Sequence, residues 1–490
     1  MHDDEARAQS GGERAEAASK KPTPIPKFQV FILLFIQFAE PITALVIYPF
    51  VVQFVRDTGI TGGDEAKTGF YAGLLESAFF LAESFTVFHF GRMSDIYGRR
   101  PTLLLAPVGL GIAMLGFGLS KTFWTLFLFR CAQGAFNGNI GVAKTVMNEI
   151  SDSSNAADIF SLIPLMWSVG ATMSPFMGGV LANPAAKWPD TLGKIHFLWT
   201  HPYFLPCAVA ACIAFISFAF AFVGLRETLP SAIARQNKKH KKRNDFASDT
   251  DPLLPTPGHL VEQPDTAESM LPLRDLLTRP VLIAVLNHGL LCFCDMSYES
   301  LLPLVYATPI GLGGLGLKPY DIGLIMGVCG ICNALVQTFL GGRVIRYFGP
   351  RRIFTASFCA LILAFSAYPL LSFFAERAGR IDTAVVVVLV FQLSCSFFLY
   401  FAFSTGMIFI MDAVPNKASV GSVSGLAQMV GTTLRSLAPS FASSLFSLSV
   451  KNNLAGGYMV YIILVGLTLG AVRCSFLLPR QLRSESENQR

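Results

Sequence analysis

The chain has 490 residues, of which 52% are hydrophobic and only 14% are charged. Soluble globular proteins average roughly 25% charged residues, so this composition excludes an ordinary soluble enzyme. The formal net charge of +6 is carried by basic residues in loops beside apolar runs and in one polar stretch, which is typical of membrane proteins and excludes a nucleic-acid-binding protein.

The apolar runs predict transmembrane helices in two groups of six. Each run is long enough to cross a hydrocarbon core of ~30 Å as a helix, and the backbone in lipid must be hydrogen-bonded within its own segment. The first group is residues 28–55, 69–90, 102–119, 123–146, 159–181 and 202–225. The second group is residues 280–304, 320–340, 353–373, 384–411, 420–446 and 458–478.

These runs divide the chain into five parts. We expect a disordered N-terminal tail (1–27), a six-helix bundle (28–225), a linker (226–279), a second six-helix bundle (280–478) and a C-terminal tail (479–490). The linker mixes basic clusters, prolines and acids, which favours disorder. The N-terminal tail carries Asp3, Asp4 and Glu5, which argues against a cleaved signal peptide or a mitochondrial presequence. The predicted fold class is an all-α membrane protein with twelve transmembrane helices.

Arginines in two loops on one side of the membrane set the predicted orientation. They follow the second and eighth helices and are Arg92, Arg99, Arg100, Arg343, Arg346, Arg351 and Arg352. Most loops on the opposite side carry only one or two basic residues, such as Lys121 and Lys318. By the positive-inside rule we expect both termini and the linker in the cytoplasm.

The same two loops form an internal repeat. Gly91-Arg-Met-Ser-Asp95-Ile-Tyr-Gly98-Arg99-Arg100 follows the second helix, and Gly342-Arg-Val-Ile-Arg346-Tyr-Phe-Gly349-Pro-Arg351-Arg352 follows the eighth. They lie about half the chain apart. Many secondary transporters are built from such repeats, with the substrate site between them near the bilayer midplane.

Ionisable residues inside transmembrane helices are costly and usually functional. Glu40 lies mid-way along the first helix with Gln37 one turn away, and Arg130 lies in the middle of the fourth. We expect proton and substrate to compete for a Glu40–Arg130 pair. Arg435 in the eleventh helix either serves the cavity or ties helices together. The alternative for each residue is a fixed structural hydrogen bond or ion pair.

Two stripes of titratable residues are also predicted. Glu76 and Glu83 share one face of the second helix, and His288, Asp295 and Glu299 share one face of the seventh. We expect both stripes to line the translocation path. The alternative is a solvated outer end of each helix, which applies to Glu76, Asp295 and Glu299.

Small residues at four-residue spacing predict tightly packed helix seams. They occur in the fourth helix at Gly134 and Gly138, and in the fifth at Gly170, Ser174, Gly178 and the adjacent Gly179. Pro175 is expected to bend the fifth helix.

Three sequence motifs resemble those of the major facilitator superfamily. Gly91 to Arg100 matches its G-x-x-x-D-x-x-G-R-R loop signature, at the loop where the family carries it. Arg130-Cys-Ala-Gln133-Gly134 resembles its R-x-x-Q-G pattern in the fourth helix. Gly170 to Gly179 resembles the "antiporter" pattern of the fifth helix, although Ser174 stands where glycine usually precedes the proline.

Further segments resemble the fungal drug:proton antiporter group that includes relatives of the zinc-induced-facilitator-like proteins. They are residues 40–42, 48–50, 226–230, 301–304, 313–316 and 435–439. The resemblance covers roughly residues 28–478 and implies two pseudo-symmetric six-helix bundles. A sugar porter is disfavoured, because Arg226-Glu-Thr-Leu-Pro230 replaces the P-E-S-P-R type motif.

The resemblance implies a secondary transporter that works by alternating access, and we expect it to exchange a small organic solute for protons. The proton gradient is the expected energy source, with no cofactor and no metal. We expect a monomer in the plasma membrane or the vacuolar membrane. One alternative is a facilitator or symporter on the same fold, and another is a non-transporting receptor or scaffold. No nucleotide-binding loop, metal cluster or nucleophile motif indicates an enzyme.

Gating is predicted from the repeated loops. The eleventh helix is expected to begin near Ser419, and its positive dipole end is a suitable partner for Asp95 across the two halves. Arg99 is expected to pair with Asp95 and orient it. In the second half, Arg346 is expected to contact an acid at the start of the fifth helix, Asp152 or Asp158. The alternative for Arg346 is that it only follows the positive-inside rule.

Overall fold

The computed structural model describes residues 26–151, 156–229, 232–234, 277–415 and 420–479, and the elements in these residues are helices, with no strand among them. The first half consists of α2 (Lys27–Leu45), α3 (Tyr48–Asp57), α4 (Thr68–Tyr97), α5 (Arg99–Leu119), α6 (Phe123–Phe136), η2 (Asn137–Asn139), α7 (Ile140–Ile150), α8 (Ala156–Leu181) and α11 (Phe204–Gly224). Two short helices, α9 (Pro184–Lys187) and α10 (His196–Thr200), lie in the loop between α8 and α11.

The second half repeats this arrangement. It consists of α14 (Arg279–Ala307), α15 (Pro319–Val336), η5 (Gln337–Gly341), α16 (Gly342–Phe348), α17 (Pro350–Ala378), α18 (Thr383–Asp412), α19 (Val420–Lys451) and α20 (Met459–Ser475). Seven helices in the described part of the chain are long and apolar enough to cross a membrane by themselves. The others include α4, which carries Glu76 and Glu83, and the divided pair α6 and α7.

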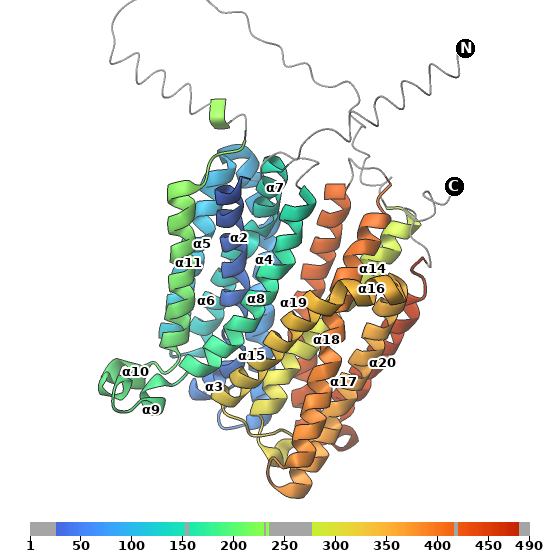
Figure 1. Ribbon diagram of the computed structural model, residues 1–490. Coiled ribbons are helices and arrows are strands. Elements are labelled where there is room, and N and C mark those ends of the chain that lie inside the picture. The colour runs from blue at the N-terminus through green and yellow to red at the C-terminus, as the bar shows by residue number, and fades with distance from the viewer. Residues whose placement is uncertain (1–25, 152–155, 230–231, 235–276, 416–419, 480–490) are drawn as a thin grey trace, which may run out of the picture.

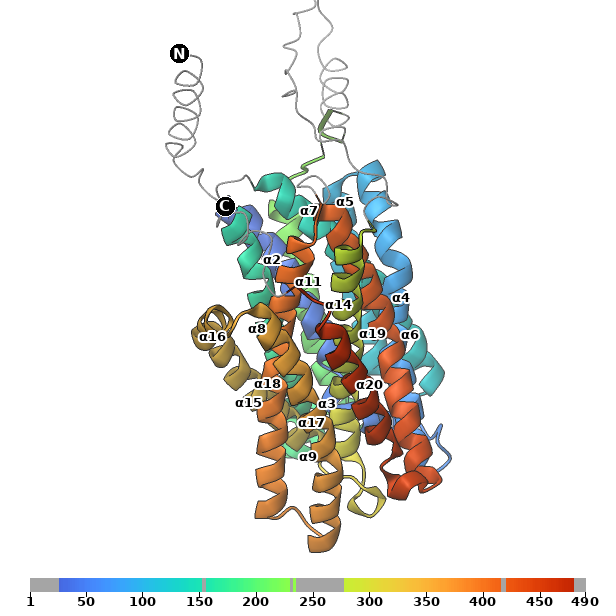
Figure 2. The same ribbon diagram turned by 90° about the vertical axis from the view of Figure 1, so that its right-hand side faces the viewer.

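The two halves lie side by side (Figure 1). Helix α4 packs against α19, and α8 packs against α15, while α3 makes smaller contacts with α14 and α15, so each half contributes three helices to the interface. Figures 1 and 2 show the described ends of the chain, at α2 and α20, and the loop carrying α9 and α10 at different levels of the bundle. We call the end where α2 begins the terminal end, and the end with α9 and α10 the far end.

The halves touch closely near the far end. A Cβ atom on Gly179 of α8 would lie 2.6 Å from the Cα atom of Gly323 of α15. A Cβ atom on Gly73 of α4 would lie 2.7 Å from the carbonyl oxygen of Pro439 of α19. Only glycine permits such approach of one backbone to another. The halves are therefore held together where α4 begins and where α8 ends.

Three of the predicted continuous helices are interrupted. The first is divided at residues 46–47 because Pro49, in the first turn of α3, has no N–H to bond to the Leu45 carbonyl. The fourth passes through a 3₁₀ turn at Asn137–Asn139, and the eighth through a π-helix at Gln337–Gly341. Such π-helical turns are frequent at functional sites. None of these three breaks was predicted from the sequence.

The predicted packing residues lie against backbone of neighbouring helices. A Cβ atom on Gly134 would lie 2.0 Å from the Phe79 carbonyl oxygen, and one on Gly178 would lie 2.0 Å from the Val46 carbonyl oxygen. Gly138 faces the Thr86–Val87 backbone in the same way, whereas Gly170 faces the side-chain ring of Pro41. Ser174 is fully buried, and the carbonyl oxygen of Pro175 approaches Gly323.

Candidate functional site

A cavity of about 560 Å³ lies between the two halves. Its walls come from α2, α3, α7 and α8 on one side and from α14, α15, η5, α18 and α19 on the other. Ligand pockets for small organic molecules usually measure about 300–1,000 Å³ and carry a few polar groups on a mainly apolar wall. The size and position suit a small organic ligand held by both halves.

Most of the predicted ionisable residues line this cavity. They are Glu40 with its neighbour Gln37, then His288, Asp295, Glu299 and Arg435. Lys144 of α7 also lines it and was missed. Its signal in the sequence was a single lysine inside the fourth apolar run. Tyr48, Trp167 and Tyr400 add an aromatic wall that the sequence did not single out.

Arg130 does not pair with Glu40, so that expectation was wrong. Arg130 is fully buried, donates to Gln133 Oε1 at 2.8 Å and to the Ala44 carbonyl at 2.8 Å, and lies over the Phe79 ring at 4.4 Å. Ala44 is close to the break between α2 and α3, and the arginine satisfies its carbonyl there. Arg130 is therefore held behind the cavity wall by α2, α4 and α6.

The charged neighbours of Glu40 are Glu83, Lys144 and Arg435. Glu83 is 4% exposed and lies behind the cavity wall on α4. Gln37 donates to the Ile140 carbonyl at 3.4 Å, which ties α2 to the start of α7. Two acids and two bases from α2, α4, α7 and α19 thus form one electrostatic cluster across the halves.

Glu76 does not lie at a solvated outer end, so that alternative is also wrong. It is 2% exposed, and its carboxylate accepts a hydrogen bond from the Ser300 hydroxyl of α14. This bond joins the second helix of one half to the first helix of the other. Phe79 and Phe80 of the same helix are buried and do not line the cavity.

The stripe on α14 faces the cavity, as expected from its spacing. Arg435 of α19 interacts electrostatically with Asp295, and it lies over the Phe403 ring at 5.5 Å. His288 Nε2 lies 3.6 Å from the Cys292 sulfur. The second half thus contributes two carboxylates, one guanidinium and one imidazole to the same space.

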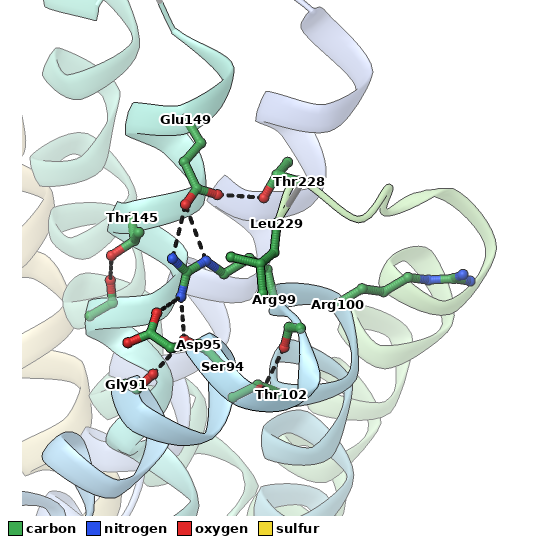
Figure 3. A network of polar contacts seen from close by, with 12 residues as sticks. Gly91, Ser94, Asp95, Arg99, Arg100, Thr102, Thr145, Glu149, Thr228 and Leu229 are labelled. Atoms are coloured by element: carbon green, nitrogen blue, oxygen red, sulfur yellow. Dashed lines mark hydrogen bonds and ion pairs between the residues drawn. The ribbon is translucent and has the colours of Figure 1, made fainter. Parts of the chain in front are cut away.

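A second polar network lies near the terminal end of the first half (Figure 3). Arg99 donates to Asp95 Oδ1 at 2.5 Å, to Ser94 Oγ at 2.6 Å and to Glu149 Oε1 at 3.0 Å. Glu149 also accepts from the Thr228 hydroxyl at 2.5 Å. Arg99 pairs with Asp95 as expected, while Glu149 is a partner that the sequence did not reveal. The network ties α4, α5, α7 and the segment after α11 together.

Glu227 closes this network from the chain that follows α11. Its carboxylate accepts from the backbone N–H groups of Arg99 at 2.8 Å and Arg100 at 3.1 Å. These are the first N–H groups of α5, so Glu227 caps the positive end of that helix. A Cβ atom on Gly98, which has φ +117°, would lie 2.5 Å from Glu227 Oε2. The only signal for this cap was the Arg226–Pro230 motif.

The two gating contacts expected between the halves involve groups outside the described part of the structure. The expected start of the eleventh helix lies in residues 416–419, outside the described residues, and the described partner of Asp95 belongs to its own half. Arg346 is exposed. Its two expected acids, Asp152 and Asp158, lie outside the side chains that the structure describes. Both contacts stay predictions.

Comparison with known proteins decides the family. The sequence profile of the Major Facilitator Superfamily matches residues 33–439. This chain belongs to the major facilitator superfamily. It is 31% identical to the "Major facilitator-type transporter psiT2" of Psilocybe cyanescens, over 96% of this chain and 93% of that protein. It is 27% identical to "Protein ZINC INDUCED FACILITATOR-LIKE 1" of Arabidopsis thaliana, over 91% of this chain and 90% of that protein.

The major facilitator fold agrees with solved structures. A D-xylose-proton symporter matches with a TM-score of 0.65 at 15% identity, over 93% of this chain and 98% of that chain. The expected fold class and the resemblance to fungal efflux and zinc-induced-facilitator-like proteins are confirmed. The chain is a multi-pass integral membrane protein of a transporter family.

Proposed function

We propose that this major facilitator protein exports a small organic solute in exchange for protons, by alternating access. The observation that carries the proposal is the cavity between the halves, which both halves line with titratable groups. A solute bound there contacts two bodies that can move against each other, which is what alternating access requires. The carboxylates in the same cavity are the groups that would exchange protons.

The contacts between the two halves support one conformational state of the transport cycle. Near the far end, Ser440 N–H of α19 donates to Ser77 Oγ of α4 at 2.9 Å, and Arg56 of α3 donates to the Ala307 carbonyl of α14 at 3.2 Å. Near the terminal end, the Arg99 network stays within the first half. With the termini in the cytoplasm, these far-end contacts between the halves support an inward-facing arrangement.

The experiment is transport in proteoliposomes with an imposed pH gradient and a panel of organic solutes. Solute movement driven by the gradient, with counterflow of protons, is the expected result. Solute exchange that ignores the gradient would identify a facilitator. If no solute is transported and a loop or tail of the chain binds a partner protein, the chain is a receptor or scaffold.

Glu40→Gln tests the coupling. The amide imitates a permanently protonated carboxyl, so we expect solute binding to remain in part and pH-driven transport to be lost. Glu376→Gln is the matched control, because Glu376 is exposed on α17 and outside the cavity. Uptake rates are measured at several imposed gradients. The same pH dependence in Glu40→Gln as in the parent would remove Glu40 from the proton path.

We also propose that both termini and the linker lie in the cytoplasm of a monomeric protein, in the plasma membrane or the vacuolar membrane. The arginines of the two repeated loops support this orientation. A cysteine placed in the linker, Ser248→Cys, should react with a membrane-impermeant maleimide only after permeabilisation of cells that carry it at the plasma membrane. The parent gives the background from native cysteines. Reaction in intact cells would reverse the orientation.

A further inference from the structure

The buried charges around the cavity do not balance. In the described residues that line it or lie directly behind its wall, five carboxylates face three fixed cations: Glu40, Glu76, Glu83, Asp295 and Glu299 against Arg130, Lys144 and Arg435. An isolated charge in a low-dielectric interior is expensive, so it takes a proton or a partner of opposite charge. The carboxylates in excess of the three cations therefore require protons or a further group of positive charge.

The excess is concentrated at one place. Arg130 interacts with Glu76, and Lys144 and Arg435 share Glu40 and Glu83. Among the described residues, the one cationic neighbour of Asp295 is Arg435, which it shares with the same two glutamates. The charged neighbours of Glu299 are Asp295 and Glu76, both acids. We call Asp295 and Glu299, one turn apart on α14, the acidic corner.

The carboxylates of the acidic corner are open to the cavity. Both residues line it and are partly exposed. The four ion pairs found within the described part of the chain all lie elsewhere, and none includes Asp295 or Glu299. A cation in the cavity can therefore approach Glu299 without displacing a protein cation, whereas at Asp295 it lies beside Arg435.

Aromatic rings surround the acidic corner. Tyr48, Tyr298 and Tyr400 line the cavity, and each interacts electrostatically with Glu299. The Tyr298 hydroxyl is buried, and its polar neighbour is Ser396, which also lines the cavity. Carboxylates beside aromatic rings form the usual environment for an organic ammonium ion, because the ring faces attract cations as well.

We propose that the acidic corner binds the positively charged group of an organic cation, whose apolar body lies against the tyrosines. The inference rests on the proposed transport function and specifies its substrate class. An organic anion fits worse, because Lys144 and Arg435 already face three carboxylates. One cation that binds at Glu299 displaces one proton into the cavity water, so the exchange leaves the net charge of the site unchanged.

The titratable and charged groups that interact with the acidic corner come from α14 itself and from six neighbouring helices. They are Glu76 of α4, Tyr48 of α3, Cys292, Cys294 and Tyr298 of α14, Cys329 of α15, Tyr368 of α17, Tyr400 of α18 and Arg435 of α19. Of these, Glu76 accepts a hydrogen bond from Ser300 and does not line the cavity. Competition between protons and the cation is therefore expected at Asp295 and Glu299.

The test uses two probes of the same shape and opposite charge, tetraphenylphosphonium and tetraphenylborate. Binding to the purified full-length protein in detergent is measured by equilibrium dialysis, with protein-free micelles as the blank. We expect saturable binding of the phosphonium and about tenfold weaker affinity in Glu299→Gln, because the variant loses the negative charge that attracts the cation in a site partly shielded from water. Glu376→Gln, outside the cavity, should bind as the parent does.

Acidification and two further variants complete the test. A change from pH 7.5 to pH 5.5 should weaken phosphonium binding in the parent and much less in Glu299→Gln. Asp295→Asn and Tyr400→Leu should also weaken it, and size-exclusion profiles identify any variant that fails to fold. Tighter binding of the borate, or unchanged phosphonium affinity in folded Glu299→Gln and Asp295→Asn, would overturn the proposal. If no cation binds but a pH gradient drives another solute in liposomes, this inference fails and the proposed function stands.

Discussion

The two repeated loops occupy equivalent places in the two halves and share only part of their chemistry. Both have a glycine with positive φ before the next helix, Gly98 at +117° and Gly349 at +82°. Both carry an arginine that donates to the end of the last helix of its half: Arg100 to the Phe222 carbonyl at 2.7 Å and Arg351 to the Phe476 carbonyl at 2.5 Å. The repeat therefore preserves the turn and its anchor.

The acidic network belongs to the first loop alone. Arg99 is replaced by Pro350 and Asp95 by Arg346 in the second loop. Proline at the first position of α17 has no N–H and needs no capping acceptor. The first N–H groups of α5 instead bind Glu227. The difference shows that the second loop is complete as a turn, whereas the first loop has extra side chains that link four segments.

The largest expected difference is between Asp95→Asn and Arg346→Gln. Asp95 accepts from Arg99, which is 10% exposed, whereas Asp95 itself is 64% exposed, so its loss should lower transport about fivefold, because a partly exposed ion pair contributes up to about 1 kcal/mol. Arg346 is exposed, and its loss should cost less than about threefold, as for a surface ion pair. Initial rates are normalised to the amount of protein in the membrane.

The proposed contact of Arg346 sharpens this comparison. Paired charge reversal of Arg346 and Asp158 should recover part of any loss that the single reversals cause. Normal transport by Asp95→Asn at normal membrane levels would remove Asp95 from gating and make the two loops equivalent.

A smaller effect is expected from the helix cap. Glu227→Ala removes the acceptor for the first N–H groups of α5, which should lower the stability of the first half by about 1 kcal/mol. Thermal unfolding in detergent, followed by circular dichroism, should show a midpoint lower by on the order of 1–2 °C. Pro350→Ala is the matched change in the second loop and restores an N–H at the start of α17. If Glu227→Ala unfolds at the parental temperature, Glu227 does not stabilise α5.

The sequence predicted where helices occur better than which side chains meet. Apolar runs located both halves because lipid requires long apolar helices. Ionisable residues within those runs identified Glu40, Asp295 and Glu299, since burial of charge is costly wherever the fold places it. The Glu40–Arg130 pair was wrong because a carbonyl beside a helix break, at Ala44, binds the arginine. Such a partner depends on tertiary structure.

Residues at helix ends were the hardest to predict. Glu149 and Glu227 complete the first loop, but acids near helix ends are common and usually solvated, so their spacing carried little information. Lys144 lay near the predicted end of an apolar run, where a lysine normally reaches the membrane surface. In the structure it faces the cavity because the 3₁₀ turn at Asn137–Asn139 precedes α7.

The smallest effects on stability are expected for Arg100 and Arg351, the arginines that both loops share. Arg100→Ala and Arg351→Ala each remove a cation from the end of α11 or α20, where a positive charge interacts favourably with the helix dipole. Because both side chains are partly open to solvent, each change should lower stability by only ~0.5 kcal/mol, and by similar amounts. Arg352→Ala is the control, since Arg352 is exposed and has no hydrogen bond or ion pair among the described residues. Chemical denaturation of the purified variants measures the three changes side by side. Unequal losses from Arg100→Ala and Arg351→Ala, with Arg352→Ala unchanged, would show that the anchor is not shared and that the second loop has a separate role.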